Sequence, residues 1–331
     1  MKDNILKFTL IKNEFRKNNN PVKFLISIIC IVVLIVAFGL FLNMDPEDIG
    51  GNQTEEEIIL QEKLDSASDW KERYQLQMEM NSSLSELYGE EYVDMQNSLL
   101  QYKIDNNIAP KEHGNNWCDF SKYVFSTLGF IIVIMAAFIF TQTLNIEYNN
   151  KTEKLLFTKP FSRNRILASK YFVSVVFLLG LTAIWYFISF IVGGIMFSFK
   201  EINATSVLYF NHDIFETTIF KESICNAMIV FVNAFICGTI SFAVCSISRS
   251  RIAGICSGLG LFFIGKPVTQ NLFESGIKWV KYLPFSYTNM KMFINNPLNT
   301  SFNMINGCIL IGALLVILMS VSLITLKKRD I

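Results

Sequence analysis

The sequence has very little histidine and, within its apolar runs, no acidic residue. Its 331 residues include two histidines, His113 and His212, and both stand outside the long apolar runs. Intramembrane proteolysis and ion-coupled transport each depend on polar or ionisable groups at membrane depth. Their absence argues against both classes. We therefore predict no catalytic residue, no metal site and no cofactor, and we do not expect the chain to be an enzyme.

A cysteine pattern and a basic excess are also missing. Cys118 is the one cysteine in a long polar segment, and there is no Cys-x-x-Cys pair. This usage predicts neither a disulfide framework nor a zinc site. The net charge is +1, whereas a phosphate-binding surface needs a basic excess, so nucleic acid is not an expected partner. The other six cysteines lie within apolar runs: Cys30, Cys225, Cys237, Cys245, Cys256 and Cys308.

Long apolar runs are what the sequence does contain. A helix needs roughly 20 apolar residues to cross the hydrocarbon core of a bilayer. The first run, Val22–Leu42, follows a basic N-terminal tail. A signal peptide also starts with basic residues, but its apolar part is only about 7–15 residues long and ends at a small-residue cleavage site. Residues 41–45 offer no such site. We therefore interpret this run as a retained transmembrane span.

The apolar runs predict an all-α integral membrane protein with six transmembrane helices and a helical extracellular insert between the first and second spans. The fifth span is short and leads into Lys266-Pro267, which favours a re-entrant or interfacial piece after it. The predicted segments are a cytoplasmic amphipathic helix (1–21), spans at 22–42, 123–144, 171–199, 223–247, 252–265 (short) and 305–326, an extracellular insert (43–122), a cytoplasmic loop (145–170), an extracellular loop (200–222), an extracellular or re-entrant segment (266–304) and a cytoplasmic tail (327–331).

Basic residues in the connections set the expected orientation. They gather in the N-terminal tail, between the second and third spans, at Arg249 and Arg251, and at the C-terminus. Since cytoplasmic loops carry an excess of Lys and Arg, this alternation places both termini in the cytoplasm of a plasma-membrane protein. The segment 266–304 does not fit as well, because it is assigned outside although its lysines outnumber its one glutamate, Glu274.

The insert 43–122 is acidic near its start, and apolar residues recur in it at three- and four-residue spacing. This spacing predicts two amphipathic helices on either side of residues 81–83, forming a small hairpin packed on itself or on the ends of the spans. The insert is interpreted either as a solvated lid without a ligand or as a surface that captures a substrate or partner. The acidic bias would make that ligand cationic.

Small polar and aromatic residues within the spans have two readings. They can line a translocation path, or they can bond and pack against a neighbouring helix. The glycines Gly254 and Gly258 form a Gly-x-x-x-Gly pair, which is typical of close helix packing. The candidates for path lining are Asn226, Asn233 and Ser241 along one face of the fourth span, with Trp185 and Tyr186 in the middle of the third.

The connection between the second and third spans carries the most specific pattern. It resembles the cytoplasmic loop of ABC type-2 export permeases through Glu153, Leu155, Leu156, Pro160, Ser162, Arg163 and Lys170. Residues 10–15 resemble the amphipathic helix that precedes the first span in that family, and residues 282–286 resemble the segment before the last span. The resemblance covers most of the membrane part but not the insert 43–122.

The resemblance implies a permease subunit of an ATP-driven exporter. Its partners would be a separate ABC ATPase, which binds ATP and Mg²⁺, a second permease subunit (identical or different) and membrane lipid. The apolar spans suit an amphiphilic cargo such as an antimicrobial peptide, a drug or a lipid-linked molecule. The residues expected to dock on the ATPase, as an amphipathic helix in a groove, are Glu147, Glu153, Leu155, Leu156, Phe157, Pro160 and Arg163.

Two other interpretations stay open. The loop 145–170 is also readable as an ordinary basic connection that meets lipid head groups. The chain is also readable as a membrane-anchored sensor or scaffold whose acidic extracellular domain binds a ligand or partner. An exporter needs the loop for its ATPase, whereas a sensor of this kind would tolerate changes there.

Overall fold

The computed structural model describes residues 13–15, 21–42, 69–83, 89–109, 116–149, 163–197, 199–200, 204–210, 213–275, 277–288 and 304–328. It is mostly helical, as predicted. Five of its helices are long and apolar enough to cross a membrane, which indicates a multi-pass membrane protein. Their candidate spans are Trp117–Ile146, Asn164–Met196, Ile219–Ser248, Arg251–Phe273 and Ile305–Thr325.

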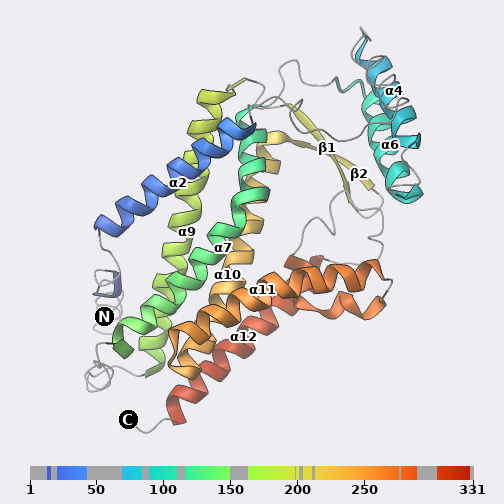
Figure 1. Cartoon of the computed structure of the whole chain (residues 1–331). Coiled ribbons are helices and arrows are strands. Elements are labelled where there is room, and N and C mark those ends of the chain that lie inside the picture. Colours follow the sequence, from blue (N-terminus) through green and yellow to red (C-terminus); the bar gives the residue numbers. More distant parts are fainter. Residues whose placement is uncertain are drawn as a thin grey trace, which may run out of the picture.

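The long helices form a bundle around α10 (Figure 1). Helix α10 (Ile219–Ser248) contacts α7 (Trp117–Asn149) most extensively, and also α9 (Arg163–Met196), α11 (Arg251–Glu274) and α12 (Met304–Lys328). The buried core lies mainly between α7, α9 and α10. The predicted second, third and fourth spans therefore correspond to helices that pack on one another.

The predicted first span is helix α2 (Pro21–Leu42), which packs mainly on α9. Its part from Ser27 to Leu42 is apolar but shorter than the five candidate spans. Ile31 and Ile35 are buried in the core, whereas neighbouring large side chains of α2 are exposed. The sixth crossing therefore stays a prediction.

The predicted short fifth span is wrong, because α11 continues through Pro267 to Glu274. A proline inside a helix removes one backbone hydrogen bond and costs about 3 kcal/mol, yet it does not have to end the helix. The Thr269 hydroxyl donates to the carbonyls of Gly265 and Lys266, both at 2.9 Å. The first part of the predicted re-entrant segment is thus helical, and the short 3₁₀ helices η2 (Lys278–Tyr282) and η3 (Pro284–Thr288) follow it.

The predicted helical hairpin is present in the insert. Helices α4 (Trp70–Ser83) and α6 (Glu90–Asp105) pack side by side, and the Asn81 Nδ2 atom donates to Asn97 Oδ1 at 3.1 Å. The break between them comes later than expected, since α4 includes residues 81–83. Helix α6 also packs through Met95 and Leu99 on Val207 and Tyr209, which lie outside the insert.

The all-α prediction is incomplete, because the predicted loop 200–222 contains an antiparallel hairpin. Strand β1 (Thr205–Phe210) pairs with β2 (Asp213–Thr218), and Val207 faces Glu216 in the register. Val, Tyr and Thr favour strands, and alternate residues of a strand lie on one face, so that Val207 and Tyr209 both meet α6. Hydropathy alone does not reveal a hairpin this short.

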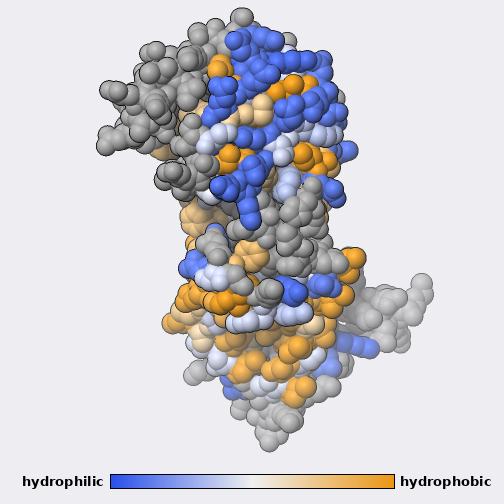
Figure 2. All heavy atoms as spheres, turned by 90° about the vertical axis from the view of Figure 1, so that its right-hand side faces the viewer, coloured by the Kyte–Doolittle hydropathy of each residue, from blue (hydrophilic) through white to orange (hydrophobic). Residues whose placement is uncertain are grey.

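Hydrophilic and hydrophobic surfaces lie at different ends of the molecule. Figure 2 shows hydrophilic side chains gathered at the end that carries α4 and α6, and hydrophobic side chains over the opposite part. The exposed apolar residues belong largely to the candidate spans, among them Ile195, Ile252, Ile264, Ile305 and Val316. Such a surface suits contact with lipid tails rather than water.

Candidate functional site

The predicted coupling loop is shorter than expected, because the helices on both sides extend into it. Helix α7 ends at Asn149 and α9 begins at Arg163, so Glu147 and Arg163 are helical in their backbones. Lys170 belongs to α9 rather than to a loop. The remaining predicted docking residues lie outside the described residues: Glu153, Leu155, Leu156, Phe157 and Pro160.

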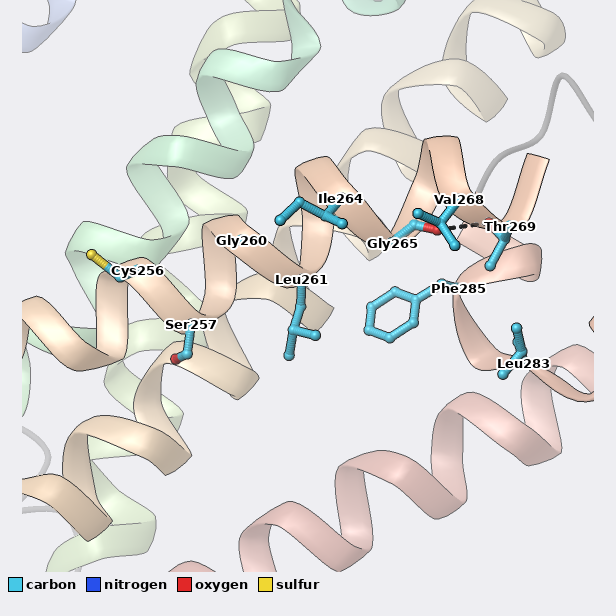
Figure 3. Close-up of a pocket in the computed structure, with 10 residues that line it drawn as sticks. All are labelled: Cys256, Ser257, Gly260, Leu261, Ile264, Gly265, Val268, Thr269, Leu283 and Phe285. Atoms are coloured by element: carbon cyan, nitrogen blue, oxygen red, sulfur yellow. Dashed lines mark hydrogen bonds between the residues drawn. The ribbon is translucent and has the colours of Figure 1, made fainter. Parts of the chain in front are cut away.

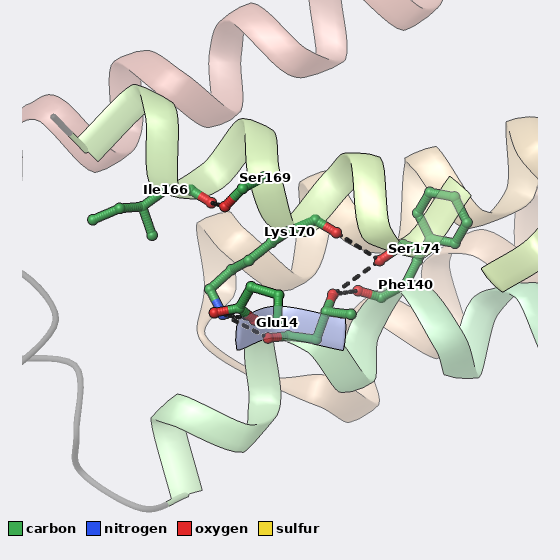
Figure 4. A network of polar contacts seen from close by, with 7 residues as sticks. Glu14, Phe140, Ile166, Ser169, Lys170 and Ser174 are labelled. Carbon is green, nitrogen blue, oxygen red and sulfur yellow. Dashed lines mark hydrogen bonds and ion pairs between the residues drawn. The ribbon is translucent and has the colours of Figure 1, made fainter. Parts of the chain in front are cut away.

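A buried ion pair lies where these two helices meet the N-terminal segment (Figure 4). The Lys170 Nζ atom lies 3.1 Å from a carboxylate oxygen of Glu14 and donates to the main-chain oxygen of Thr143 at 3.0 Å. The two charged side chains are 3% and 5% exposed. One ammonium group thus connects α9, the end of α7 and the short helical segment 13–15.

Hydroxyl groups extend this cluster along α7 and α9. The Thr143 and Ser174 hydroxyls are 3.1 Å apart, and Ser174 Oγ also donates to the Lys170 carbonyl at 3.0 Å. Because a buried charge is costly unless it is paired and hydrogen-bonded, the cluster fixes the relative position of the two helices. The sequence indicates Lys170 and residues 10–15 separately but does not predict that Glu14 and Lys170 pair.

The aromatic candidates on α9 are held by the helix bundle. Trp185 is fully buried in the core, and its Nε1 atom has no hydrogen-bond partner among the described residues. The Tyr186 hydroxyl lies 3.2 Å from Ser223 Oγ on α10. A second tyrosine on the same helix, Tyr171, meets Thr239 Oγ1 at 2.9 Å. Tyr186 and Tyr171 therefore bridge α9 and α10.

The candidates on α10 differ from one another in their surroundings. Asn226 is half-buried, whereas Asn233 is buried and its Oδ1 atom has no partner among the described residues. Ser241 is fully buried and its side chain contacts Gly258 of α11. Ser241 thus lies in a contact between α10 and α11. This agrees with the interpretation that it packs against a neighbouring helix rather than lining a translocation path.

The Gly-x-x-x-Gly pair packs as predicted. A Cβ atom added at Gly254 would lie 2.7 Å from the Ser241 carbonyl oxygen, and one added at Gly258 would lie 2.8 Å from the Cys237 carbonyl oxygen. These distances are too short for a side chain, so α10 and α11 approach at backbone distance. Thr141 of α7 also reaches Gly254, so three helices meet there.

An open apolar groove lies on the other side of α11, between this helix and η3 (Figure 3). Its volume is about 440 Å³. The Phe285 ring lies beneath α11, close to Gly265. None of the five path candidates lines this groove, whose walls are formed by Cys256, Ser257, Gly260, Leu261, Ile264, Gly265, Val268, Thr269, Leu283 and Phe285.

The end of the helix bundle next to the β-hairpin has polar contacts of its own. The Lys122 Nζ atom of α7 lies 2.7 Å from Glu222 of α10, and Ser206 Oγ of β1 donates to the same carboxylate at 2.7 Å. These groups are partly exposed, so the ion pair contributes less than a buried one. In the neighbouring α4–α6 hairpin, burial raises the pKa of the Tyr74 hydroxyl, and Lys103 lies 5.6 Å from the centre of that neutral ring.

Comparison with known proteins shows a family but no activity. The chain is 24% identical over 281 residues to YhcI of Bacillus subtilis (strain 168), an uncharacterized protein, and the match covers 81% of this chain and 86% of YhcI. A family model described as "Protein of unknown function (DUF2705)" matches residues 91–331, which include every long helix of the bundle except α2. The chain therefore belongs to the DUF2705 family.

Proposed function

We propose that this chain is the membrane-spanning permease subunit of an ATP-driven ABC exporter of the type-2 class. In this proposal a separate ATPase subunit binds ATP and Mg²⁺ and docks on residues 145–170. Its closure moves α7 and α9, the two helices that flank the docking loop. A second permease subunit completes the path for an amphiphilic cargo, such as an antimicrobial peptide, a drug or a lipid-linked molecule.

The observation that carries the proposal is the buried pair of Glu14 and Lys170. The resemblance to type-2 ABC permeases rests on three stretches, and two of them, residues 10–15 and the loop that ends at Lys170, are far apart in the sequence. An ion pair of 3.1 Å joins them near the end of α7 and the start of α9. A displacement of the docking loop would therefore reach the N-terminal segment and both helices together, as a permease driven from outside the membrane requires.

Co-purification from the native host in mild detergent tests the proposal. The chain should bring down an ABC ATPase. The variant Leu155→Asp/Leu156→Asp should lose the ATPase without losing the chain itself, because charges replace the apolar docking residues. The control variant Asn106→Asp/Asn107→Asp adds the same two charges at exposed polar positions after α6, outside the docking loop, and it should retain the ATPase.

Other outcomes contradict the exporter. If the wild-type chain brings down no ATPase, or brings down a kinase instead, the sensor interpretation replaces it and α4, α6 and the β-hairpin become the place to look for a ligand. If both double variants bind the ATPase equally, the docking residues are wrong even where the partner is right.

A further inference from the structure

The 3₁₀ helix η2 presents aromatic side chains outward from a fixed support. Trp279 is 55% exposed and Tyr282 is 65% exposed, whereas Val280 between them is completely buried. The Ser286 hydroxyl of η3 donates to the Val280 carbonyl at 2.8 Å, which ties the two short helices together. The exposed aromatic rings are therefore held in place rather than carried on a loose loop.

Two glycines hold η3 between α11 and α12. A Cβ atom added at Gly265 of α11 would lie 3.2 Å from the Phe285 ring. The Tyr287 ring occupies the space that a side chain at Gly307 of α12 would need. Because both rings pack against backbone, η3 has little freedom to shift. The hydrogen bond from Ser286 to the Val280 carbonyl holds η2 against η3.

The apolar groove begins where η2 ends. Leu283 follows Tyr282 directly, and it lines the groove together with Phe285. The opposite wall is a stripe along α11 that includes Leu261, Ile264 and Val268 (Figure 3). An amphiphile whose polar end lies at η2 would therefore find a continuous apolar path of about 440 Å³ along a membrane-spanning helix.

Positive charge predominates around η2, with Glu274 at the end of α11 as the one nearby acidic residue in the sequence. Residues 275–304 contain three lysines and neither aspartate nor glutamate. The Lys281 Nζ atom lies 5.5 Å from the centre of the Tyr282 ring, and among the described residues no carboxylate lies within ion-pair distance of it. A lysine beside exposed tryptophan and tyrosine is the side-chain set that meets phosphate groups at the surface of a bilayer.

We propose that η2 and the groove behind it form a binding site for an anionic phospholipid. Lys281 meets the lipid phosphate, Trp279 and Tyr282 lie at the level of the head groups, and one acyl chain occupies the groove between α11 and η3. A lipid partner would also account for Lys281, which is one of the lysines in 266–304 that fit the positive-inside pattern poorly. The site does not depend on the exporter function.

Lipid retention during purification tests the site. The full chain is reconstituted with phosphatidylcholine and phosphatidylglycerol in equal amounts, then released gently, and the retained lipids are counted by native mass spectrometry. Wild type should retain phosphatidylglycerol in preference to phosphatidylcholine. Lys281→Gln should lower that preference about fivefold, while Lys221→Gln, at an exposed lysine at the start of α10, should leave it unchanged.

Filling the groove gives a second, independent measurement. Ile264→Trp places a large ring in the groove and should reduce retention of both lipids, whereas Ile252→Trp, at an equally exposed position on α11 outside the groove, should not. Equal retention of the two lipids by wild type, or unchanged preference in Lys281→Gln, would overturn the proposal. Loss of a dimer instead of a lipid in Ile264→Trp would assign the groove to a second copy of the chain.

Discussion

The contacts that α10 makes with α7 and α11 differ in their balance from those that hold α9, which depends more on hydroxyl pairs. Towards α7 and α11, glycines let the helices approach closely: a Cβ at Gly129 would lie 2.8 Å from Val230, and one at Gly238 would lie 2.6 Å from the Phe140 ring. Helix α9 approaches α7 closely at one glycine, where a Cβ at Gly193 would lie 3.1 Å from the Trp117 Cα atom, and it also meets its neighbours through hydroxyl pairs, such as Ser121 with Ser189 at 2.8 Å. Dense packing resists displacement, whereas hydrogen bonds can exchange partners, so we expect α9 to shift more easily along its hydroxyl contacts than at Gly193 or at the buried ion pair of Lys170.

The ion pair near the start of α9 is expected to dominate the attachment of this helix to α7 and the N-terminal segment. Lys170→Met leaves the Glu14 carboxylate buried without its partner, which costs about 3–5 kcal/mol. We expect a large fall in the temperature at which the detergent-solubilised chain loses its monodisperse elution peak. Lys221→Met, which removes an exposed lysine, should have little effect.

The double variant Glu14→Leu/Lys170→Met separates charge from packing. It removes both buried charges, so it should be more stable than Lys170→Met alone. If the single and double variants are equally unstable, the pair matters through its shape rather than its charge, and the contrast between α9 and the close-packed helices weakens.

Substitution of a glycine at the contact between α10 and α11 should cause the next largest loss of stability. Gly258→Ala places a methyl group against Ser241 of α10, and such overpacking typically costs about 1–3 kcal/mol. Gly260→Ala is the matched control on the same helix, since its Cβ would meet no atom within 4 Å, and replacing a helical glycine by alanine favours the helix. Thermal stability of the two variants in the same detergent measures the difference. A Gly258→Ala chain as stable as Gly260→Ala would mean that α10 and α11 can separate at little cost.

The hydrogen bonds that the hydroxyl groups of α9 make should contribute least to the stability of the folded chain. Tyr186→Phe removes the bond to Ser223 and should cost about 0.6 kcal/mol, the average for such bonds between membrane helices. Tyr123→Phe, at an exposed tyrosine on α7, is the control. An effect as large as that of Gly258→Ala would show that α9 is held as firmly as α11.

The sequence predicted the helices well and their ends less well. The predicted span 223–247 differs from Ile219–Ser248 by a few residues, because hydropathy follows the length of the apolar segment directly. Helix α7 begins at Trp117 rather than near 123, because Asn116 Oδ1 accepts from the backbone amides of Cys118 and Asp119 and starts the helix in a polar stretch. Hydropathy carries no information about such a cap.

The sequence indicated individual residues of the candidate site but not which of them lie in contact. Glu14 and Lys170 are 156 positions apart, and each resembles an ordinary residue near the end of a span. Their pairing depends on how α9 folds back along α7, which a single sequence does not encode locally. Ser241 shows the opposite case: its polar character suggested a path, whereas Gly258 opposite it makes the position a contact.

The turn between α10 and α11 has a consequence for how the protein reaches the membrane. Arg249 adopts a left-handed conformation with φ of 57° and closes α10, and Ser250 already caps α11 through the amide of Ala253. Each of the two connecting residues therefore caps one helix, so no further residue separates α10 from α11. We expect α10 and α11 to leave the translocation machinery as one hairpin, with Arg249 and Arg251 staying on the side where insertion began.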